Sequence, residues 1–411
     1  MTLASAAAGG ASDHLAALRA EALAVPESGI VELFNYGRGR EGLIPLWVGE
    51  GDLATPACIV EAAQKSLAAG ETFYTYQRGI PELRQAIADY MTLHYGGPFA
   101  GNARPFDPER FFVTIGGMHA LQLAVRMTCG FGDEILVPAP AWPNFDGVLL
   151  AAGARPVPTP LAFDDRGQNA GWRLDIDALE QAITPKTRAM VINSPANPTG
   201  WTASLDDLRA LLDIARRDGL WIIADEIYGR FFYDGGRAPS FHDIMEEGDR
   251  ILFVQTFSKN WAMTGMRIGW LEAPPALGQV IENLIQVSTS GVPVPTQRGA
   301  VAALTEGEPF FAMQATRARA NRDALASALA ATGRVRLALP RGAFYMFCAV
   351  DGEPDTRALA FRLVDEAGVG VAPGSAFGPG GESFMRLCYA RDSGQIAEAA
   401  RRMADWLDRN R

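Results

Sequence analysis

The sequence predicts an α/β protein with a large domain, whose mostly parallel central sheet is covered by helices, and a smaller α/β domain built from both termini. Two observations predict this fold. Short, continuously apolar runs alternate with longer amphipathic stretches through the middle of the chain, which is typical of strands that crossover helices bury on both faces. The chain also has 411 residues, of which 48% are hydrophobic, enough for one large core or two separate ones.

The predicted strands are short, apolar and regularly spaced. They are Phe111–Thr114, Ile135–Val137, Ala189–Ile192, Trp221–Ala224, Ile251–Gln255 and Ile268–Leu271. Helices are expected over residues 116–128, directly after the first strand, and over Leu205–Arg217, which begins in an Asp-rich turn. Because ligands of such sheets bind at the carboxyl ends of the strands, the polar segments found there are candidate sites.

The two ends of the chain differ from its middle. Residues from about 29 to 56 show no regular pattern, so we expect irregular structure there. After Phe310 comes a long Arg/Ala-rich helix, then a mixed pattern through GAFYMFCAV and ESFMRLCYA to a last helix at Ser393–Asp408. We therefore expect a large domain over residues 56–310 and a small domain from residues 1–55 and 311–411, with a cleft between them.

Composition excludes several classes of function. The net charge of −10, without any Lys/Arg block, argues against a nucleic-acid or membrane partner. The four cysteines and four histidines are scattered, which predicts no disulfide framework and no metal site. The N-terminus reads as a flexible tail rather than a signal peptide, and no apolar run is long enough to span a membrane. These features predict a cytoplasmic enzyme.

Two polar segments follow predicted strands in the second half of the sheet. Residues 194–200, SPANPTG, form a turn in which Asn197 presents an amide at a strand end; an ordinary Pro/Gly loop is the alternative. Asp225 ends the strand Trp221–Ala224, where a buried carboxylate needs a cationic or donor partner. Tyr228 lies one helical turn further on. The alternative is that Asp225 simply caps a helix.

Two further segments supply a cation and a set of anion-binding groups. Lys259 lies among small hydroxyl residues, glycines and aromatics, and burial there lowers the pKa of a lysine and frees a neutral amine. Thr256, Ser258 and Arg267 form a suitable set for a phosphate dianion. The strand-to-helix turn TIGGMHAL offers the backbone N–H groups of Gly117, Met118 and His119 to a phosphate. Tight packing explains the paired glycines equally well, and His119 is as readily a structural histidine.

The chain contains the motifs NPTG, D-E-I-Y, S-K-x7-R and a late R-L-C-Y-A. Together these motifs resemble the fold-type-I aminotransferases of the aspartate aminotransferase superfamily, which use pyridoxal phosphate (PLP). The resemblance covers nearly the whole chain. It implies that Lys259 holds PLP as a Schiff base and that Asp225 keeps the pyridine nitrogen protonated. Asn197 and Tyr228 resemble the residues that bind the phenolic oxygen of the cofactor, and Trp142 the aromatic residue that stacks on its ring.

The same resemblance assigns the remaining site residues. Gly117, Met118, Thr256, Ser258 and Arg267 match the phosphate cup, with His119 beside it. Tyr74 resembles the tyrosine that reaches the phosphate of the neighbouring subunit, which implies a homodimer with shared active sites. Arg386 matches the arginine that binds the substrate α-carboxylate, and Gly49 the loop glycine opposite it. Asn197, Trp142 and Ile30 are expected to contact the substrate too.

The resemblance implies a ping-pong transfer of an amino group from an L-amino acid to a 2-oxo acid, with Lys259 moving the proton. One departure is Gly51, where many relatives have proline, which loosens the loop at the substrate entrance. Relatives that prefer dicarboxylic substrates carry an arginine in the stretch matching Val287–Gln297 or a lysine at Met118. Both cations are missing here, so a neutral or aromatic amino donor is favoured.

The side-chain pocket and the reaction both leave alternatives. Ile30, Trp47 and Met118 are candidates for an apolar pocket wall; otherwise they are core residues, or Arg38 or Arg40 supplies a distal cation. A PLP-dependent carbon–sulfur β-lyase, or another enzyme such as a cyclopropane-forming synthase, would use the same lysine, aspartate and arginine. A PLP-sensing regulator needs a DNA-binding module, and only about 25 residues precede the first family-like segment.

Overall fold

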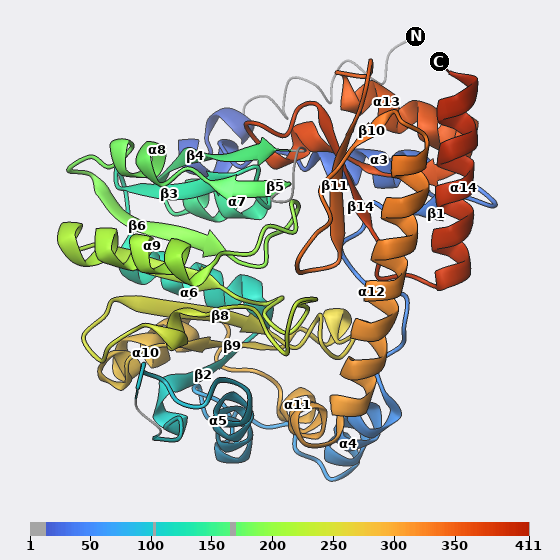
Figure 1. Ribbon diagram of the computed structural model, residues 1–411. Coiled ribbons are helices and arrows are strands. Elements are labelled where there is room, and N and C mark those ends of the chain that lie inside the picture. The colour runs from blue at the N-terminus through green and yellow to red at the C-terminus, as the bar shows by residue number, and fades with distance from the viewer. Residues whose placement is uncertain (1–13, 102–103, 165–169, 411) are drawn as a thin grey trace.

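The computed structural model describes residues 14–101, 104–164 and 170–410, and it has the α/β architecture that the sequence predicts (Figure 1). An eight-stranded sheet has the order β2-β9-β8-β7-β6-β3-β4-β5. Its strands are β2 (Phe111–Thr114), β3 (Glu134–Ala139), β4 (Arg155–Asp164), β5 (Gly171–Leu174), β6 (Thr187–Asn193), β7 (Trp221–Asp225), β8 (Ile251–Thr256) and β9 (Gly269–Glu272). The predicted N-terminal tail lies mostly outside the described residues.

The centre of this sheet is parallel and its edges are antiparallel. Strands β4, β3, β6, β7 and β8 pair in parallel, whereas β9 pairs antiparallel with both β8 and β2, and β5 pairs antiparallel with β4. Strand β7 places Asp225 directly opposite Asn193 of β6 and Val254 of β8. The carboxyl ends of these three strands therefore lie at one edge of the sheet.

Helices bury both faces of the sheet, as its continuously apolar strands predict. Neighbouring residues of β7 belong to different cores: Ile222 packs in the same core as α9 (Leu205–Asp218), and Ile223 in the core that contains α6 (Gly116–Thr128). Because successive side chains of a strand point to opposite faces, the two helices cover opposite faces, in keeping with their positions in Figure 1.

The boundaries of α9 follow from its sequence. The Ser204 side chain accepts the Asp207 N–H at 3.1 Å and the Asp207 carboxylate accepts the Ser204 N–H at 2.8 Å, a capping box that satisfies free donors of the first turn. The helix ends at Gly219, whose φ of 68° is left-handed. The acidic first turn and basic last turn also suit the helix dipole.

The remaining helices of the large-sheet region connect or flank the strands. They are α4 (Ala57–Ala68), α5 (Pro81–Tyr95), α7 (Asn144–Ala151), α8 (Ile176–Gln181), α10 (Gly278–Ser288) and α11 (Val294–Glu306). Helices α4 and α11 pack against one another at one end of the molecule (Figure 1).

A second, four-stranded sheet with the order β10-β11-β14-β13 is formed by the C-terminal part of the chain. Its strands are β10 (Val335–Arg336), β11 (Tyr345–Val350), β13 (Ala372–Pro373) and β14 (Phe384–Cys388). The helices around it are α12 (Glu308–Ala331), α13 (Thr356–Arg362) and α14 (Ser393–Arg409). N-terminal segments pack on this C-terminal part: β1 (Ile44–Pro45) and β12 (Val369–Gly370) form a separate two-stranded sheet, and α3 (Gly29–Gly37) contacts β12 and β13 (Figure 1).

Two parts of the fold differ from the sequence-based expectation. Residues 29–37 form α3, although we expected irregular structure; the helix packs its one buried side chain, Leu33, into the core. Strands β4 and β5 were not predicted, because β4 contains three prolines. The prolines lie in residues 155–160, which pair with β3 but not with β5, so this half of β4 is itself an edge, where proline is tolerated.

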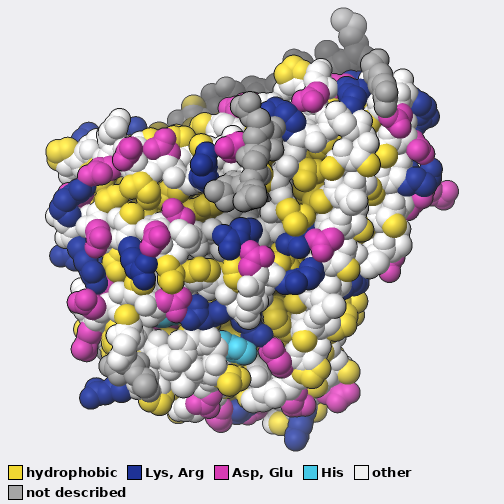
Figure 2. Space-filling model, in the orientation of Figure 1, with side chains coloured by type: hydrophobic (Ala, Val, Ile, Leu, Met, Phe, Trp, Pro, Cys, Tyr) yellow, Lys and Arg dark blue, Asp and Glu magenta, His cyan; other side chains and the backbone are white. Residues whose placement is uncertain are grey.

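The surface carries both signs of charge. On the face shown in Figure 2, basic and acidic side chains are interspersed. Many of them form ion pairs, such as Arg217 with Glu180 and Arg216 with Asp249. Within the described ranges, no helix combines the length and the apolar character that crossing a membrane requires.

Candidate active site

A cavity of about 390 Å³ lies where β6, β7 and β8 end and α6 begins. Most of the site residues predicted from the sequence line it. They are Ile30, Gly49, Gly117, Met118, Trp142, Asn197, Asp225, Tyr228, Thr256, Ser258, Lys259, Arg267 and Arg386. The volume is in the range of small-molecule sites. Segments far apart in the chain therefore converge on one ligand-sized space.

Lys259 follows β8 and projects its amine into this cavity. The Lys259 Nζ donates to the Gly49 carbonyl at 2.7 Å, so the lysine contacts the N-terminal loop across the cleft. Burial lowers the pKa of the Lys259 amine to about 8, because desolvation disfavours the charged form. The sequence context of Lys259 predicts this lowering of its pKa. The lower pKa makes the neutral, nucleophilic amine accessible near neutral pH.

Asp225 ends β7 with its side chain 2% exposed. Its carboxylate accepts a long hydrogen bond of 3.4 Å from the Ile227 N–H, and burial raises its pKa to about 7. A turn rather than a helix follows β7, so Asp225 is not a helix cap. A buried carboxylate with weak local partners that faces a cavity is suited to a cationic ligand group.

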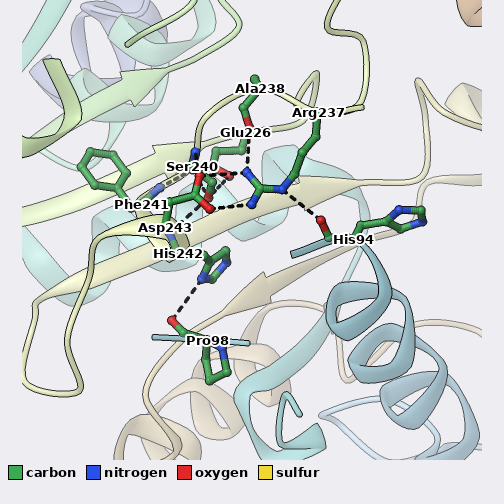
Figure 3. A network of polar contacts seen from close by, with 9 residues as sticks. All are labelled: His94, Pro98, Glu226, Arg237, Ala238, Ser240, Phe241, His242 and Asp243. Carbon is green, nitrogen blue, oxygen red and sulfur yellow. Dashed lines mark hydrogen bonds and ion pairs between the residues drawn. The ribbon is translucent and has the colours of Figure 1, made fainter. Parts of the chain in front are cut away.

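The next residue, Glu226, is buried and held in a separate network of polar contacts (Figure 3). The Ser240 hydroxyl donates to Glu226 at 2.8 Å and the Phe241 N–H at 3.3 Å. In the same network, His242 lies 3.4 Å from the Pro98 carbonyl, and Arg237 pairs with Asp243. Burial raises the pKa of Glu226 to about 7. The Glu226 charge also helps raise the pKa of Asp225, so the network bears on the electrostatics of the site.

The start of α6 and the segment after β8 form an anion-binding corner of the cavity. The first N–H groups of a helix have no partner within it, and Ile115 supplies no side-chain cap to α6. Gly116 has a φ of 71°, and a Cβ on it would come within 2.8 Å of the Arg267 guanidinium, so glycine permits the close approach of this cation. Thr256 donates to Ser258 at 2.9 Å, which places two hydroxyls side by side.

Arg386 is a buried cation with spare hydrogen-bonding capacity. Its Nη1 donates to Asn197 Oδ1 at 2.8 Å and its Nη2 donates to the Trp47 carbonyl. Its guanidinium lies between the rings of Tyr345 and Phe377, 4.7 and 4.9 Å from their centroids. The buried Arg386 Nε has no hydrogen-bond partner among the described residues. Each Nη carries two hydrogens and uses one of them for these partners, so the remaining Nη hydrogens can bind a carboxylate.

Sequence reasoning missed several residues of the cavity wall. Tyr345, at the start of β11, lies with its Oη 2.6 Å from the Tyr228 Oη. It stands in the apolar run AFYMF, and nothing in that run marks it as a site residue. Apolar wall residues were also missed, because nothing in their local pattern distinguishes them from core. They are Val31, Phe34, Val48, Leu121 and Ile227.

Three predicted residues do not join the cavity. His119 is buried, with Nδ1 accepting the Ile115 N–H at 3.3 Å and Nε2 lying 3.0 Å from Ser288 Oγ, and burial lowers its pKa to about 4. These contacts are those of a structural histidine. Of the two alternatives for Trp47, the structure supports a core residue, because its ring fills the core against Gly37 and Gly370. Tyr74 is 93% exposed.

The two arginines considered as distal cations also lie outside the cavity. Arg40 pairs with Asp365 on the surface. Arg38 stacks on Phe34, 5.1 Å from its centroid, and is exposed. Among the described residues, no group of three or more His, Cys, Asp or Glu side chains is arranged to hold a metal ion.

Comparison with known proteins agrees with this geometry. Residues 41–403 match the family model for aminotransferase class I and II. The chain is 33% identical over 386 residues to aromatic-amino-acid aminotransferase 2 of Thermococcus litoralis. That alignment covers 92% of this chain and 95% of that protein. It is 36% identical over 376 residues to arginine–pyruvate transaminase AruH of Pseudomonas aeruginosa, covering 90% of this chain and 91% of that protein.

The fold is also similar to that of solved aminotransferases. A single mutant of the aspartate aminotransferase of Thermus thermophilus superimposes with a TM-score of 0.84 at 32% identity, covering 94% of this chain and 99% of that one. Family and fold therefore agree over nearly the whole length of the chain. On this evidence, the chain belongs to the class I and II aminotransferases, a family of fold-type-I enzymes that use PLP.

Proposed function

We propose that this protein binds PLP in the cavity and transfers the amino group of a neutral or aromatic L-amino acid to a 2-oxo acid. One observation supports this most strongly: Lys259, Asp225 and Arg386 line a single cavity, and each lacks a strong ionic partner there. These are an amine, a carboxylate and a carboxylate-binding cation, the three groups that the chemistry needs.

The residues present fit the cofactor. The anion-binding corner formed by the N-terminus of α6, Thr256, Ser258 and Arg267 suits a phosphate dianion. Asp225 suits a protonated pyridine nitrogen, since that cation supplies the ionic partner which its buried carboxylate lacks. Trp142 offers an aromatic face to a planar ring, and Asn197 and Tyr228 offer donors to a phenolic oxygen.

The roles of this chain's own groups follow from their geometry. Bound PLP supplies an electron sink for the electron pair left on the substrate Cα. Arg386 binds the α-carboxylate through the Nη hydrogens that remain after Asn197 and the Trp47 carbonyl have each accepted one, and these two partners fix the plane of the guanidinium. That clamp orients the Cα–H bond. The Lys259 amine takes the Cα proton as a base and returns it as an acid, for which a pKa of about 8 is well matched.

The amino donor is proposed from the cavity wall. Ile30, Val31, Phe34, Met118 and Leu121 give it an apolar side. The Lys and Arg residues that line it in this chain are Lys259, Arg267 and Arg386, and each has a role at the reacting end. Arg298, which directly follows Val287–Gln297, forms ion pairs with Glu71 and Glu82. A distal carboxylate would enter this wall without a counter-charge, which is costly.

We also propose a homodimer and a two-domain organisation for this function. Phe73, Tyr74 and Tyr76 are 85%, 93% and 64% exposed, a cluster of aromatic side chains suited to burial against a second copy. In such a dimer Tyr74 would reach the partner's phosphate corner. Residues 56–310 would form the cofactor domain, and residues 1–55 and 311–411 the domain that brings Arg386 and Gly49 to the substrate.

The test is a panel of amino donors offered with 2-oxoglutarate and pyruvate to the PLP-treated protein. We expect new amino acid and new 2-oxo acid in equal amounts, with phenylalanine, tyrosine or a neutral donor exceeding aspartate and glutamate. Ammonia and pyruvate formed without any 2-oxo acid acceptor would instead support an elimination enzyme such as a carbon–sulfur β-lyase. Turnover restricted to dicarboxylic donors would contradict the proposed substrate class.

A further inference from the structure

Tyr345 connects three parts of the active site through one hydroxyl group. Its side chain is fully buried in the cavity wall, at the first residue of β11 in the C-terminal sheet. The Tyr345 Oη lies 2.6 Å from the Oη of Tyr228, which follows β7, and 3.2 Å from the carbonyl of Gly49 in the N-terminal loop. The same Gly49 carbonyl accepts a hydrogen bond from Lys259.

These contacts restrict where the phenolic hydrogens point. The Gly49 carbonyl can only accept, and each phenol has a single hydrogen to donate. If Tyr345 donates to Gly49, the 2.6 Å contact requires Tyr228 to donate to Tyr345, which leaves Tyr228 with no hydrogen for a ligand. If Tyr345 donates to Tyr228, the Tyr228 hydrogen remains free to point into the cavity. Tyr345 therefore decides whether Tyr228 is a donor.

We propose that Tyr345 is a positioning residue, which donates its hydrogen to Tyr228 and so directs the Tyr228 hydroxyl at the phenolic oxygen of the bound cofactor. This inference rests on the proposed function. Once the Tyr228 hydrogen points to the cofactor oxygen, the 2.6 Å contact between the two phenols still needs a donor, and Tyr345 is the phenol left to supply it. A phenol that accepts a hydrogen bond is polarised and becomes a stronger donor.

The surroundings of Tyr345 keep both phenols protonated. Burial raises the pKa of Tyr345, and burial together with Tyr345 raises the pKa of Tyr228. The charged or titratable groups that face Tyr345 are Arg386 against its ring, Cys388 on the paired strand β14, Glu50 on the N-terminal loop, Lys259 and Tyr228. Gly49 is constrained as well, since a Cβ there would come within 2.7 Å of the Tyr345 Oη.

The experiment removes the hydroxyl and keeps the ring. Y345F, Y228F and the double variant are prepared beside Y233F, a control in which another buried tyrosine loses its 2.6 Å hydrogen bond to the Ala343 carbonyl. Tyr233 is not among the residues that line the cavity. The readouts are the pH midpoint of the visible absorbance change of each PLP-loaded protein and its dissociation constant for PLP.

A weaker donor stabilises the anionic phenolic oxygen less, so it is protonated at higher pH. We expect Y345F to raise the midpoint in the direction of Y228F but by less, and to weaken PLP binding by about 2- to 10-fold, the range for one hydrogen bond. Y233F should leave the midpoint at the wild-type value. In the Y228F background, Y345F should cause no further shift.

Two results would overturn the inference while leaving the proposed function intact. They are a Y345F midpoint equal to that of the wild type, and an equal shift from Y345F with or without Tyr228. A wild-type protein that takes up no PLP would overturn the proposed function itself, and this inference with it. Melting temperatures of the cofactor-free variants show whether Y345F is damaged more than Y233F.

Discussion

Replacing Arg386 with lysine tests the proposed carboxylate clamp, because it keeps the charge and removes the planar donor pair. In the structure, the guanidinium is fixed by Asn197 and the Trp47 carbonyl and lies between two aromatic rings, with Nε left free. A lysine ammonium lacks the planar fork that makes these contacts and binds a carboxylate through two parallel hydrogen bonds. Losing one hydrogen bond to a charged group costs about 1.5–3 kcal/mol. At about 1.4 kcal/mol per factor of ten, kcat/KM should fall by about 10- to 150-fold.

The assay compares phenylalanine with 2-phenylethylamine, which has the same side chain but no carboxylate. The rate at which each converts the loaded cofactor is followed by absorbance under single-turnover conditions. R386K should slow the reaction of phenylalanine by the stated factor and leave that of the amine within about twofold, since the amine never contacts residue 386. An equal loss for both compounds would refute the clamp, as would an unchanged preference for phenylalanine.

Three further predictions follow from the same geometry. Because burial lowers the pKa of Lys259 to about 8, the fraction of Lys259 in the neutral form rises from roughly a tenth at pH 7 to nine tenths at pH 9. The rate of PLP uptake by the cofactor-free protein should therefore rise about tenfold over this range and then level off. A rate that continues to rise beyond pH 10 would contradict the low pKa. M118K places a cation in the apolar wall, so kcat/KM for aspartate relative to phenylalanine should rise at least about tenfold, while the uncharged control M118Q should leave that ratio unchanged. G370A forces a methyl group into the Trp47 ring, so it should destabilise the fold by about 1–3 kcal/mol and lower the melting temperature. The control G236A, at an exposed and open position, should have the melting temperature of the wild type.

The central sheet was predictable because its strands are apolar on both faces and are separated by clear turn and capping residues. Strand β2 and helix α6 have the predicted bounds, and β7 extends the prediction by one residue, Asp225. The missed strand β4 contains three prolines, which local reasoning counts against a strand. The missed helix α3 is stabilised by packing against the C-terminal sheet, a contact between residues more than 300 positions apart in the chain.

The reacting groups were predictable because each sits in a short motif directly after a strand, and strand ends converge at one edge of a parallel sheet. The residues that form the walls of the cavity were not predictable from the sequence. Val31, Phe34 and Tyr345 have side chains typical of core residues, and their place in the site depends on how the N-terminal and C-terminal segments pack on the large sheet. For the same reason the sequence left open whether Trp47 lines the pocket or packs in the core, since its sequence neighbours do not reveal the two glycines, Gly37 and Gly370, that its ring contacts.

The most direct test of the account is to find where PLP attaches. The lysines of this chain are Lys65, Lys186 and Lys259, and the first two are exposed on the surface. The protein is incubated with PLP, reduced with borohydride to make the link permanent, digested, and mapped by mass spectrometry. We expect one reduced cofactor per chain, on the peptide that contains Lys259, and loss of the visible absorbance in K259A. Labelling of Lys65 or Lys186 alone, or an equal yield in K259A, would contradict it.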